Sequence, residues 1–433
     1  MATTFFMLAG EASGDSHAAK LITALKALEV DARFAGMGGP SMAKAGLEVA
    51  KDLEGMQVVG FWEVARKFGF FKRVFHELLD RVKQQRPSAL ICVDYPGFNL
   101  RFAREVRKLG IPVLYYIVPQ VWAWKAMRAK SMSQFVDRAF CVFEFETPFF
   151  EKFGLKTQFV GHPLIDDHGL RNADGELKLP LGPKTVAFLP GSRAAEFSAL
   201  APVMADSFHL ALKANSDLRA LMSVAPGMPP KVVARTSVWL GFAAGGVPRR
   251  ASDAGADVAR EVYARPGIHW GPLPDGELPR DREEFIRRLQ SVNSVIKALE
   301  QSGIPHARLL PSLADFSVVK SGTSTLEAGL AGNPMCVVYK SSSISYAIAR
   351  LLVNIPVFSL VNIVLGRYAV PELLQGEVNP YRIAEEIKRG LTDEKYRVQQ
   401  RAALAELPEK LGGPGASARA AKGIMDFLKG RGL

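Results

Sequence analysis

Two loops in the second half of the chain combine glycine, serine and charged residues in a way that suits a phosphate ligand. The first is Pro190–Arg193, which comes directly after the apolar run Thr185–Leu189 and before a helical pattern. Backbone N–H groups at the start of a helix lack partners within it, and together with the helix dipole they attract phosphate oxygens. Arg193 adds a fixed fork of donors that fits a diphosphate. The alternative is an ordinary strand-to-helix turn with a surface arginine.

The second loop is Ser321–Glu327, which follows an apolar run that ends near Lys320. Its small residues can begin a helix, with Glu327 about one turn inside it. An acid there can accept hydrogen bonds from a ribose diol, or it can belong to a capping box that begins at Thr323 or Ser324. The chain has neither GxxxxGK[ST] nor a full GxGxxG, which argues against ATPases and dehydrogenases. The residues of the two loops that we expect around a diphosphate are Gly191, Ser192, Arg193, Ser321, Gly322, Thr323 and Ser324.

Two acids in the first half of the chain follow apolar runs that are typical of strands. Glu11 lies in AGEASGD after the first run, and Asp94 ends ALICVD just before the turn YPGFN. Active sites of α/β folds usually lie at the carboxyl ends of strands. A carboxylate such as Asp94 can act there as general base on a substrate hydroxyl. A cap or turn role is the alternative for Asp94.

Aromatic residues and histidines occur near the same strand ends. Trp122 and Trp124 of PQVWAWK can line a sugar or acyl pocket, or they can simply pack in the interior. His17 and His162 can contact substrate, although we expect local hydrogen bonds for them. No HExxH or comparable cluster occurs in the sequence, so we expect no metal site and no cofactor.

The segment Met56–Phe75 mixes bulky apolar residues with basic ones. It is too apolar for an ordinary surface helix, and too short and charged to span a bilayer. Aromatic residues beside a basic face favour an element that lies on anionic lipid, whereas a core helix with basic edges is the alternative. Nucleic acid is not an expected partner, because stacking platforms are missing. The residues that we expect to contact the membrane or acyl chains are Val58, Val59, Phe61, Trp62, Phe68, Phe70 and Phe71.

These residues need a scaffold that brings several strand ends together. Short apolar runs alternate with helical patterns, and the rhythm restarts after a Gly- and Pro-rich stretch at Pro163–Pro183. The pattern predicts two doubly wound α/β domains with parallel sheets. The expected strands are Phe5–Ala9, Ala89–Val93, Val113–Ile117, Arg138–Val142, Thr157–Val160, Thr185–Leu189, Ser237–Phe242, Phe316–Val319 and Met335–Tyr339, and the expected helices include Ser16–Leu28, Phe102–Leu109 and Ala201–Ala214.

Composition limits the partners further. The 433 residues include 55 Lys and Arg against 43 Asp and Glu, a net charge of +12 that favours anionic partners. The cysteines Cys92, Cys141 and Cys336 each lie in an apolar run, which indicates buried thiols in a reducing compartment. The first residues show no basic lead before their apolar run, so they predict a buried strand rather than a signal peptide.

Taken in order, the motifs AGEASGD, GMGGP, VDYPGFN, VPQVWAWK, FVGHP, LPGSRAAE, SGTSTLEAGLAGNPM, SLVNIVLGR and PELLQGE resemble the lipid A disaccharide synthase family. The resemblance covers nearly all of the chain except about residues 226–305. It implies a GT-B-type fold, with two Rossmann-like domains that face each other across a cleft. It also implies a bacterial enzyme of lipopolysaccharide synthesis in Gram-negative cells, cytoplasmic and peripheral on the inner face of the inner membrane.

The reaction that this resemblance implies is a metal-independent, inverting glycosyl transfer. The donor would be UDP-2,3-diacylglucosamine and the acceptor 2,3-diacylglucosamine 1-phosphate (lipid X). The products would be UDP and a β-1,6-linked tetraacyl disaccharide 1-phosphate. The matching positions are Asp94 for the candidate base and Glu11 for a second acid. Arg193, Glu327, Asn362 and Gln375 match positions for the UDP moiety, and Glu377 falls in the same segment as Gln375.

The same resemblance suggests a division of the chain into three parts. Residues 1–165 would form the domain for acceptor and membrane contact, and residues 166–380 the donor domain with an atypical insert at about 226–305. Residues 381–433 would be C-terminal helices that pack back on the first domain.

Two features depart from the family pattern. Gly97 stands where the family usually has a second acid, and residues 226–270 lengthen the spacing between LPGSR and SGTST. These departures leave open another GT-B enzyme acting on UDP-N-acetylglucosamine, either a lipid-linked transferase or an epimerase. They also leave open a non-catalytic, membrane-associated binding protein.

Overall fold

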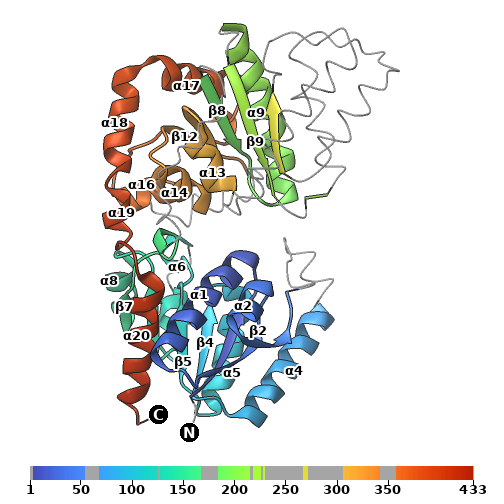
Figure 1. The fold of residues 1–433 in the computed structure, drawn as a ribbon, viewed down its shortest axis with the longest axis vertical. Coiled ribbons are helices and arrows are strands. Elements are labelled where there is room, and N and C mark those ends of the chain that lie inside the picture. Colours follow the sequence, from blue (N-terminus) through green and yellow to red (C-terminus); the bar gives the residue numbers. More distant parts are fainter. Residues whose placement is uncertain are drawn as a thin grey trace. The chain divides into compact units, whose positions relative to one another are not determined.

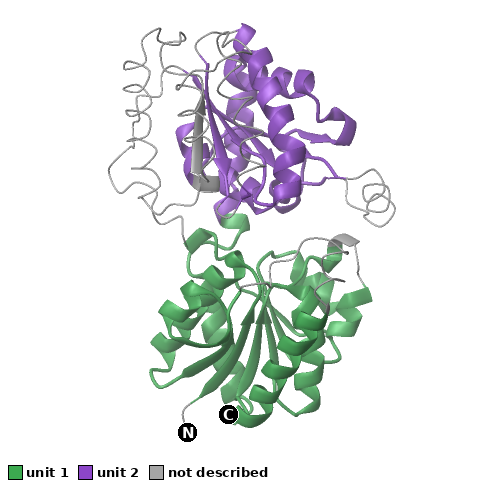
Figure 2. Ribbon diagram, turned by 90° about the vertical axis from the view of Figure 1, so that its right-hand side faces the viewer, with its two compact units in different colours: residues 1–170, 352–354, 409–433 green, residues 171–351, 355–408 purple. Residues whose placement is uncertain are grey.

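The computed structural model of the chain contains two compact units, each built around its own sheet (Figure 1). Unit 1 comprises Met1–Leu170, Leu352–Asn354 and Glu409–Leu433, and unit 2 comprises Arg171–Leu351 and Ile355–Pro408 (Figure 2). The structure describes residues 3–53, 68–124, 127–166, 184–214, 218–225, 228–229, 267–271, 306–341 and 357–432.

The described sheet of unit 1 is seven-stranded and parallel, in the order β3-β2-β1-β4-β5-β6-β7. Its central strands are buried along their whole length, as expected for a parallel sheet with helices on both faces. The strands are β1 (Thr4–Ala9), β2 (Arg33–Met37), β3 (Leu47–Lys51), β4 (Ala89–Val93), β5 (Val113–Tyr116), β6 (Arg138–Cys141) and β7 (Thr157–Phe159).

Helices cover this sheet and bury its apolar side chains. Helices α4 and α5 contribute to one hydrophobic core, where Phe102 and Val106 of α5 are inaccessible to solvent. Helix α1 packs against the C-terminal helix α20. The helices of unit 1 are α1 (Ala12–Leu28), α2 (Pro40–Ala45), α4 (Phe68–Gln85), α5 (Pro96–Lys108), α6 (Val121–Trp124), α7 (Met127–Met132), α8 (Glu146–Glu151) and α20 (Ala416–Lys429).

Helix α20 belongs to unit 1 although it lies at the other end of the sequence. The Asp166 carboxylate accepts hydrogen bonds from the backbone N–H groups of Gly415 (2.6 Å), Ala416 (3.1 Å) and Ser417 (3.2 Å) at the start of this helix. The Arg419 Nε atom donates to the carbonyl of Val160 at 2.8 Å. These bonds satisfy the unpaired N–H groups of the first turn and fix the helix on the sheet.

We predict that Asp166→Ala destabilises unit 1 by about 1–2 kcal/mol, because it removes the cap and the negative charge at the positive end of α20. The measurement is the urea midpoint followed by circular dichroism. Asp31→Ala is the matched control, since Asp31 is exposed in a turn. Equal midpoints for the two variants would show that the cap contributes nothing.

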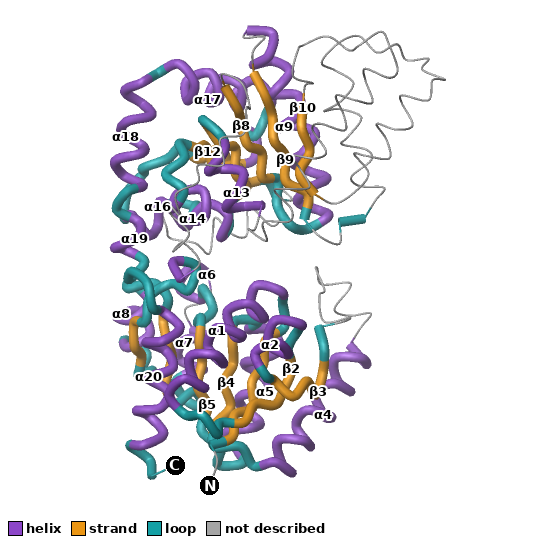
Figure 3. The backbone as a smooth tube through the Cα atoms, in the orientation of Figure 1, coloured by secondary structure: helices purple, strands orange, loops and turns teal. Residues whose placement is uncertain are grey.

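The described sheet of unit 2 has the order β10-β9-β8-β11-β12-β13, and all its pairs are parallel except that of β10 with β9 (Figure 3). Its strands are β8 (Lys184–Leu189), β9 (Leu218–Val224), β10 (Gly267–Gly271), β11 (Phe316–Lys320), β12 (Met335–Tyr339) and β13 (Glu372–Leu374). Its helices are α9 (Ala194–Ala214), α13 (His306–Leu313), α14 (Thr323–Leu330), α16 (Leu360–Leu365), the 3₁₀ turn η2 (Gln375–Glu377), α17 (Pro380–Thr392) and α18 (Glu394–Leu404), and the short α19 (Leu407–Lys410) leads back to unit 1.

The expected α/β architecture with two parallel sheets is confirmed, and the differences concern element ends and strands that the sequence pattern did not predict. Helix α1 begins at Ala12 rather than Ser16, and α9 at Ala194 rather than Ala201. In α1 the small residues Ala12–Asp15 obscure the start of the helical pattern. Strands β2, β3, β9, β10 and β13 were not expected. In β3, for example, the residues alternate weakly and two of the five side chains are exposed. The strand expected at Ser237–Phe242 lies outside the described residues.

A search of the described helices for a membrane-spanning segment found none with the necessary length and apolar character. The three cysteines are buried and unpaired with one another, as expected.

Candidate functional site

In unit 1 the two predicted acids follow neighbouring strands. Strand β1 pairs with β4 in parallel, and the last pair in the register is Ala9 with Val93. Glu11 and Asp94 therefore emerge from adjacent strands at the same carboxyl edge of the sheet. The Glu11 side chain is exposed and Asp94 is half-buried, so the edge offers two carboxylates of different accessibility. Open α/β sheets bind their ligands at this edge.

The backbone at Asp94 adopts a conformation that non-glycine residues rarely take. Asp94 and Tyr95 both have φ of 48°, in the left-handed region. The fully buried Asn99 holds this turn, since its Nδ2 atom donates to the carbonyls of Asp94 (2.7 Å), Val93 (3.3 Å) and Leu8 (3.3 Å). The Tyr115 hydroxyl donates to the Asp94 carbonyl at 2.6 Å. Strain maintained by surrounding bonds is common at functional sites.

The close approach of the two strand ends explains the glycine before Glu11. A Cβ atom at Gly10 would lie 2.2 Å from Cδ1 of the Tyr95 ring, so only glycine fits there. Burial raises the pKa of Tyr95 to about 12, and the negative charge of Glu11 adds to the shift. The phenol therefore stays protonated at neutral pH beside the Glu11 carboxylate.

Asp15, the other acid of AGEASGD, has a structural role. Its buried carboxylate accepts hydrogen bonds from the backbone N–H groups of Gly39 (2.7 Å), Ser41 (3.0 Å) and Met42 (3.0 Å). Asp15 thereby caps α2 and joins the AGEASGD motif to the GMGGP motif, which lies at the end of β2. The two motifs are far apart in the sequence but form one structural feature.

In unit 2 the two predicted phosphate loops also follow neighbouring strands. Strand β8 pairs with β11 in parallel, with Leu189 opposite Val319. Glu196 of α9 joins the two loops, because its Oε1 atom lies 2.8 Å from Nζ of Lys320 and 3.5 Å from Nη1 of Arg193. Gly191 has a φ of 111°, in the region that favours glycine. The structure thus brings both loops to one edge of the sheet, with the Arg193 side chain 48% exposed beside them.

The second loop starts α14 at Thr323, and its N-cap is Gly322 with a φ of 155°. Thr323 and Ser324 therefore lie inside the first turn, so a capping box that begins at either residue does not form. Glu327 is half-buried in the second turn of the helix. Its predicted contact with ribose stays a prediction.

Asn362, predicted to contact UDP, lies in a dense hydrogen-bond network. Its Nδ2 atom donates to the Glu372 carboxylate (2.7 Å) and the Val370 carbonyl (2.9 Å), and its Oδ1 atom accepts from the N–H groups of Ala369 and Val370. The side chain is fully buried. Asn362 thus organises this segment, and a contact between its side chain and UDP would require some of these bonds to break.

Glu372 is the residue of this region that the sequence reasoning missed. Its carboxylate accepts hydrogen bonds from the N–H groups of Phe358 (2.7 Å) and Ser359 (2.8 Å), from the Ser359 hydroxyl and from Asn362. Gln375 fixes the chain after β12, because its Oε1 atom accepts a hydrogen bond from the N–H of Ser341 at 2.8 Å. The only available signal was the PELLQGE motif, in which Glu372 looked no different from Glu377.

The segment predicted to contact the membrane is described only in part. Val58, Val59, Phe61 and Trp62 lie outside the described residues, and so does the side chain of Phe68. Phe70 and Phe71 of α4 are partly buried and pack against the core of unit 1. This packing fits the core-helix alternative for Phe70 and Phe71, and lipid contact stays a prediction for the whole segment.

His162 lies at the end of β7, where it is 6% exposed. Its Nδ1 atom accepts a hydrogen bond from the N–H of Leu164 at 3.1 Å, which confirms the local role expected for it. Burial lowers the pKa of His162 to about 3, and His17 and Lys20 nearby add to the shift. The imidazole is therefore neutral at physiological pH.

This shift predicts a specific dependence of stability on pH. The unfolded chain takes up a proton at His162 near pH 6.5, whereas the folded chain does so only near pH 3. The contribution of His162 to the free energy of unfolding is therefore fully present above pH 6.5. It is lost as pH falls toward 3, with a slope of up to about 1.4 kcal/mol per pH unit. In His162→Asn, whose amide oxygen can replace Nδ1, the urea midpoint should fall less steeply with pH than in the wild type. Parallel curves would contradict the assignment.

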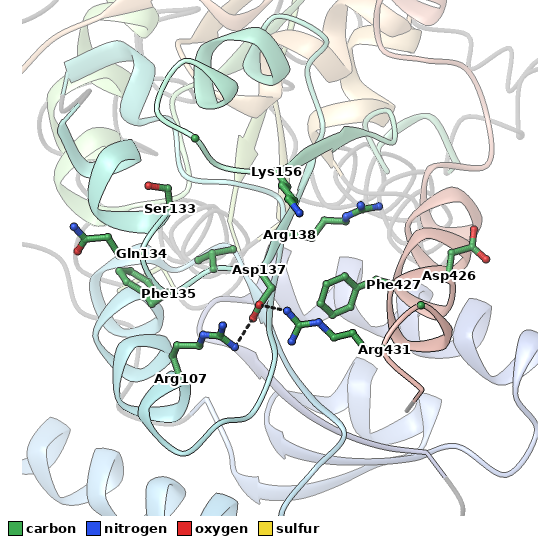
Figure 4. A pocket seen from close by; sticks show the side chains of 13 residues that line it. Arg107, Ser133, Gln134, Phe135, Asp137, Arg138, Lys156, Asp426, Phe427 and Arg431 are labelled. Atoms are coloured by element: carbon green, nitrogen blue, oxygen red, sulfur yellow. Dashed lines mark hydrogen bonds and ion pairs between the residues drawn. The ribbon is translucent and has the colours of Figure 1, made fainter.

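A cavity of about 480 Å³ opens at the opposite edge of the unit 1 sheet (Figure 4). At its base Asp137, just before β6, pairs with Arg107 (3.2 Å) and Arg431 (2.6 Å) and accepts from the N–H of Val113. None of the residues predicted for the site line this cavity. The strand ends there are amino ends and the acid is fully paired, so we do not place the functional site in it.

Within the described residues, no group of His, Cys, Asp and Glu is arranged to hold a metal ion.

Comparison with known proteins identifies the family of this chain. The family model described as "Lipid-A-disaccharide synthetase" matches residues 5–234 and 277–421. The chain belongs to the lipid-A-disaccharide synthase family. Family members that are similar to it include the synthases of Anaeromyxobacter dehalogenans (36% identical), Geobacter sulfurreducens (34%) and Myxococcus xanthus (32%), each over 98% of this chain and 96–97% of the relative. As a member of this family, the chain is a glycosyltransferase enzyme of lipid A biosynthesis.

Solved structures place this family member in the GT-B fold. The structure titled "S. aureus MnaA-UDP co-structure" has a TM-score of 0.59 at 11% identity, over 99% of this chain and 97% of that chain. The calicheamicin glycosyltransferase CalG4 has a TM-score of 0.52 at 15% identity, over 99% and 98%. At such low identity these likenesses show the fold alone.

Proposed function

We propose that this synthase transfers 2,3-diacylglucosamine from its UDP donor to the 6-hydroxyl of 2,3-diacylglucosamine 1-phosphate, with inversion at the anomeric carbon. UDP leaves, and the product is the β-1,6-linked tetraacyl disaccharide 1-phosphate. The observation that most supports this proposal is the turn at Asp94, where a half-buried carboxylate stands at a carboxyl strand end in a left-handed conformation. Asn99 and Tyr115 fix that turn by donating hydrogen bonds to the Asp94 carbonyl.

The acceptor chemistry needs a base in unit 1. Inverting transfer is a single displacement, in which the acceptor hydroxyl loses its proton as its oxygen attacks the anomeric carbon. Asp94 is assigned to take this proton, because general bases of this kind must be positioned and partly screened from water. Glu11, more exposed on the neighbouring strand end, is assigned to orient the acceptor sugar.

The donor chemistry needs positive charge in unit 2. The departing UDP carries developing negative charge, and preorganised donors stabilise it most effectively. Arg193 and the loops at Gly191 and Ser321, which lead into α9 at Ala194 and into α14 at Thr323, supply such donors at the ends of β8 and β11. The long 3.5 Å pairing of Arg193 with Glu196 leaves most of its guanidinium available to a diphosphate.

Product analysis tests the reaction directly. Purified protein is incubated with UDP-2,3-diacylglucosamine and the acylated monosaccharide phosphate, and lipids are examined by mass spectrometry. The expected product is heavier than the acceptor by one diacylated sugar residue. Epimerisation of UDP-N-acetylglucosamine without an acylated acceptor would instead support an epimerase. Binding of both substrates with no turnover would support a non-catalytic binding protein.

We predict that Asp94→Ala lowers kcat at least 100-fold, within the roughly 10²–10⁴-fold range expected for a general base. Binding of UDP should stay within a factor of two, because Asp94 lies in unit 1 and the UDP loops lie in unit 2. Kinetics and calorimetry provide the two measurements. Turnover unchanged in this variant would exclude Asp94 as the base.

We predict that Arg193→Ala weakens UDP binding by about 10–100-fold, the loss expected for a charge-assisted hydrogen bond. Arg382→Ala is the matched control, since Arg382 is an exposed arginine of unit 2 that pairs with Glu385 on its own helix. Calorimetric titration with UDP compares the two variants. If both bind as the wild type does, the Pro190–Arg193 loop does not hold the diphosphate.

Association with an anionic membrane surface is part of the same proposal. The charge of +12 and the apolar residues before α4 support it, since both substrates are acylated. Replacing Val58, Val59 and Phe61 by aspartate should at least halve co-sedimentation with vesicles that contain anionic lipid. Val398→Asp is the control, because Val398 is 54% exposed in unit 2. Equal sedimentation of both variants would remove this role from the segment.

A further inference from the structure

The carboxyl edge of the unit 1 sheet also carries aromatic side chains that the proposed chemistry does not use. Trp122 follows β5, Phe143 and Phe145 follow β6, and His162 follows β7. We call these four residues the aromatic cluster. In the sheet order β1-β4-β5-β6-β7, the acids Glu11 and Asp94 follow the first two strands and the cluster follows the next three. The cluster thus continues the edge on which the acceptor site is proposed.

The rings of the aromatic cluster contact one another in a chain. The centroids of Trp122 and Phe145 lie 4.9 Å apart in an edge-to-face arrangement, and those of Phe145 and Phe143 lie 5.5 Å apart with parallel planes. Phe143 lies 5.3 Å from His162. Phe143 and His162 are buried, whereas Trp122 and Phe145 are half-buried. Trp122 is therefore the end of the chain that a ligand can reach.

Glu146 beside the cluster is a fully buried carboxyl group. One of its oxygens accepts from Nε1 of Trp122 at 3.1 Å, and the other accepts from the N–H groups of Val142 and Phe143 at 3.1 Å each. A buried carboxyl group costs free energy unless it is hydrogen-bonded. Burial raises the pKa of Glu146 to about 8, and the bonds from Phe143, Trp122 and Val142 oppose the shift. In the described part of the chain, Trp122 is the one side chain that bonds Glu146.

This bond determines what Trp122 can offer a ligand. The indole has a single hydrogen-bond donor, and Glu146 already occupies it. Only the large apolar ring remains, so Trp122 suits an apolar group and not a phosphate or a sugar hydroxyl. Small-molecule sites are lined mainly by such apolar surfaces, with few polar groups that fix orientation.

We propose that Trp122 contacts an acyl chain of the acceptor and that Glu146 is its positioning residue, holding the indole through Nε1. The inference rests on the proposed function, because it takes the acceptor to be an acylated sugar. Glu146 does not touch the substrate and acts only through Trp122. Its effect should therefore disappear when the indole is absent.

The test is steady-state kinetics with the acylated acceptor varied at saturating donor, and then the reverse. Trp122→Leu and Glu146→Gln should each raise the acceptor KM about tenfold, within the range for an anchoring aromatic contact. The donor KM should change less than twofold. Because Glu146 acts through Trp122, the double variant should match Trp122→Leu alone. Glu144→Gln is the control, since Glu144 is an exposed acid of the same loop and should behave as the wild type.

Other variants and readouts separate this role from a structural one. Trp122→Phe keeps an aromatic ring but lacks the Nε1 donor, so it should raise the acceptor KM less than Trp122→Leu does. This comparison keeps the inference testable if Glu146→Gln folds poorly. An equal rise of donor and acceptor KM, or additive effects in the double variant, would overturn the inference. If the wild type forms the disaccharide and the Trp122 variants have the same acceptor KM as the wild type, this inference is overturned and the proposed function stays intact. A wild type that forms no disaccharide would overturn both.

Discussion

The hydrogen bonds of the Asn99 amide are the interaction on which the carboxyl edge of the unit 1 sheet, where we propose the acceptor chemistry, depends. One NH₂ group donates to carbonyls of β1, of β4 and of the turn after β4. The same group therefore fixes the two strand ends together and holds Asp94 in a backbone conformation that is costly for a non-glycine residue. Gly10 completes the arrangement, since only a residue without a side chain lets the Tyr95 ring pack on the first strand end.

In unit 2, a charged side chain rather than an amide links the loops that follow two neighbouring strands. Glu196 lies between Lys320 and Arg193 and links the loops after β8 and β11. The Glu372 carboxylate accepts hydrogen bonds from the backbone N–H groups of Phe358 and Ser359. In each unit a buried or half-buried polar group ties neighbouring strand ends, so that flexible loops present fixed donors or carboxylates. Such preorganisation is what glycosyl transfer demands, because charge develops at both the attacking hydroxyl and the departing diphosphate.

Much of the fold could be predicted because parallel strands buried on both faces are continuous apolar runs. Strands β4 and β12 have the predicted bounds, since burial leaves no room for polar residues inside them. Strands β2, β3, β9, β10 and β13 were not predicted. Of these, β3 is partly exposed and β13 has only three residues, so neither forms a continuous apolar run of ordinary length. The segment at Phe70 and Phe71 shows the same limit, since an apolar residue facing a core and one facing a lipid are alike in sequence.

The sequence by itself determined the family, the fold class and the residues that follow the strands. These properties are local or depend on the order of motifs, and Asp94, Arg193 and Glu327 were found in this way. Only the tertiary structure decided which polar residues act on the backbone. Asp15 caps a distant helix, Asn362 is enclosed by its own segment, and Glu146 holds an indole from the preceding loop. The physical reason is that hydrogen-bond partners far apart in sequence leave no periodic or compositional trace.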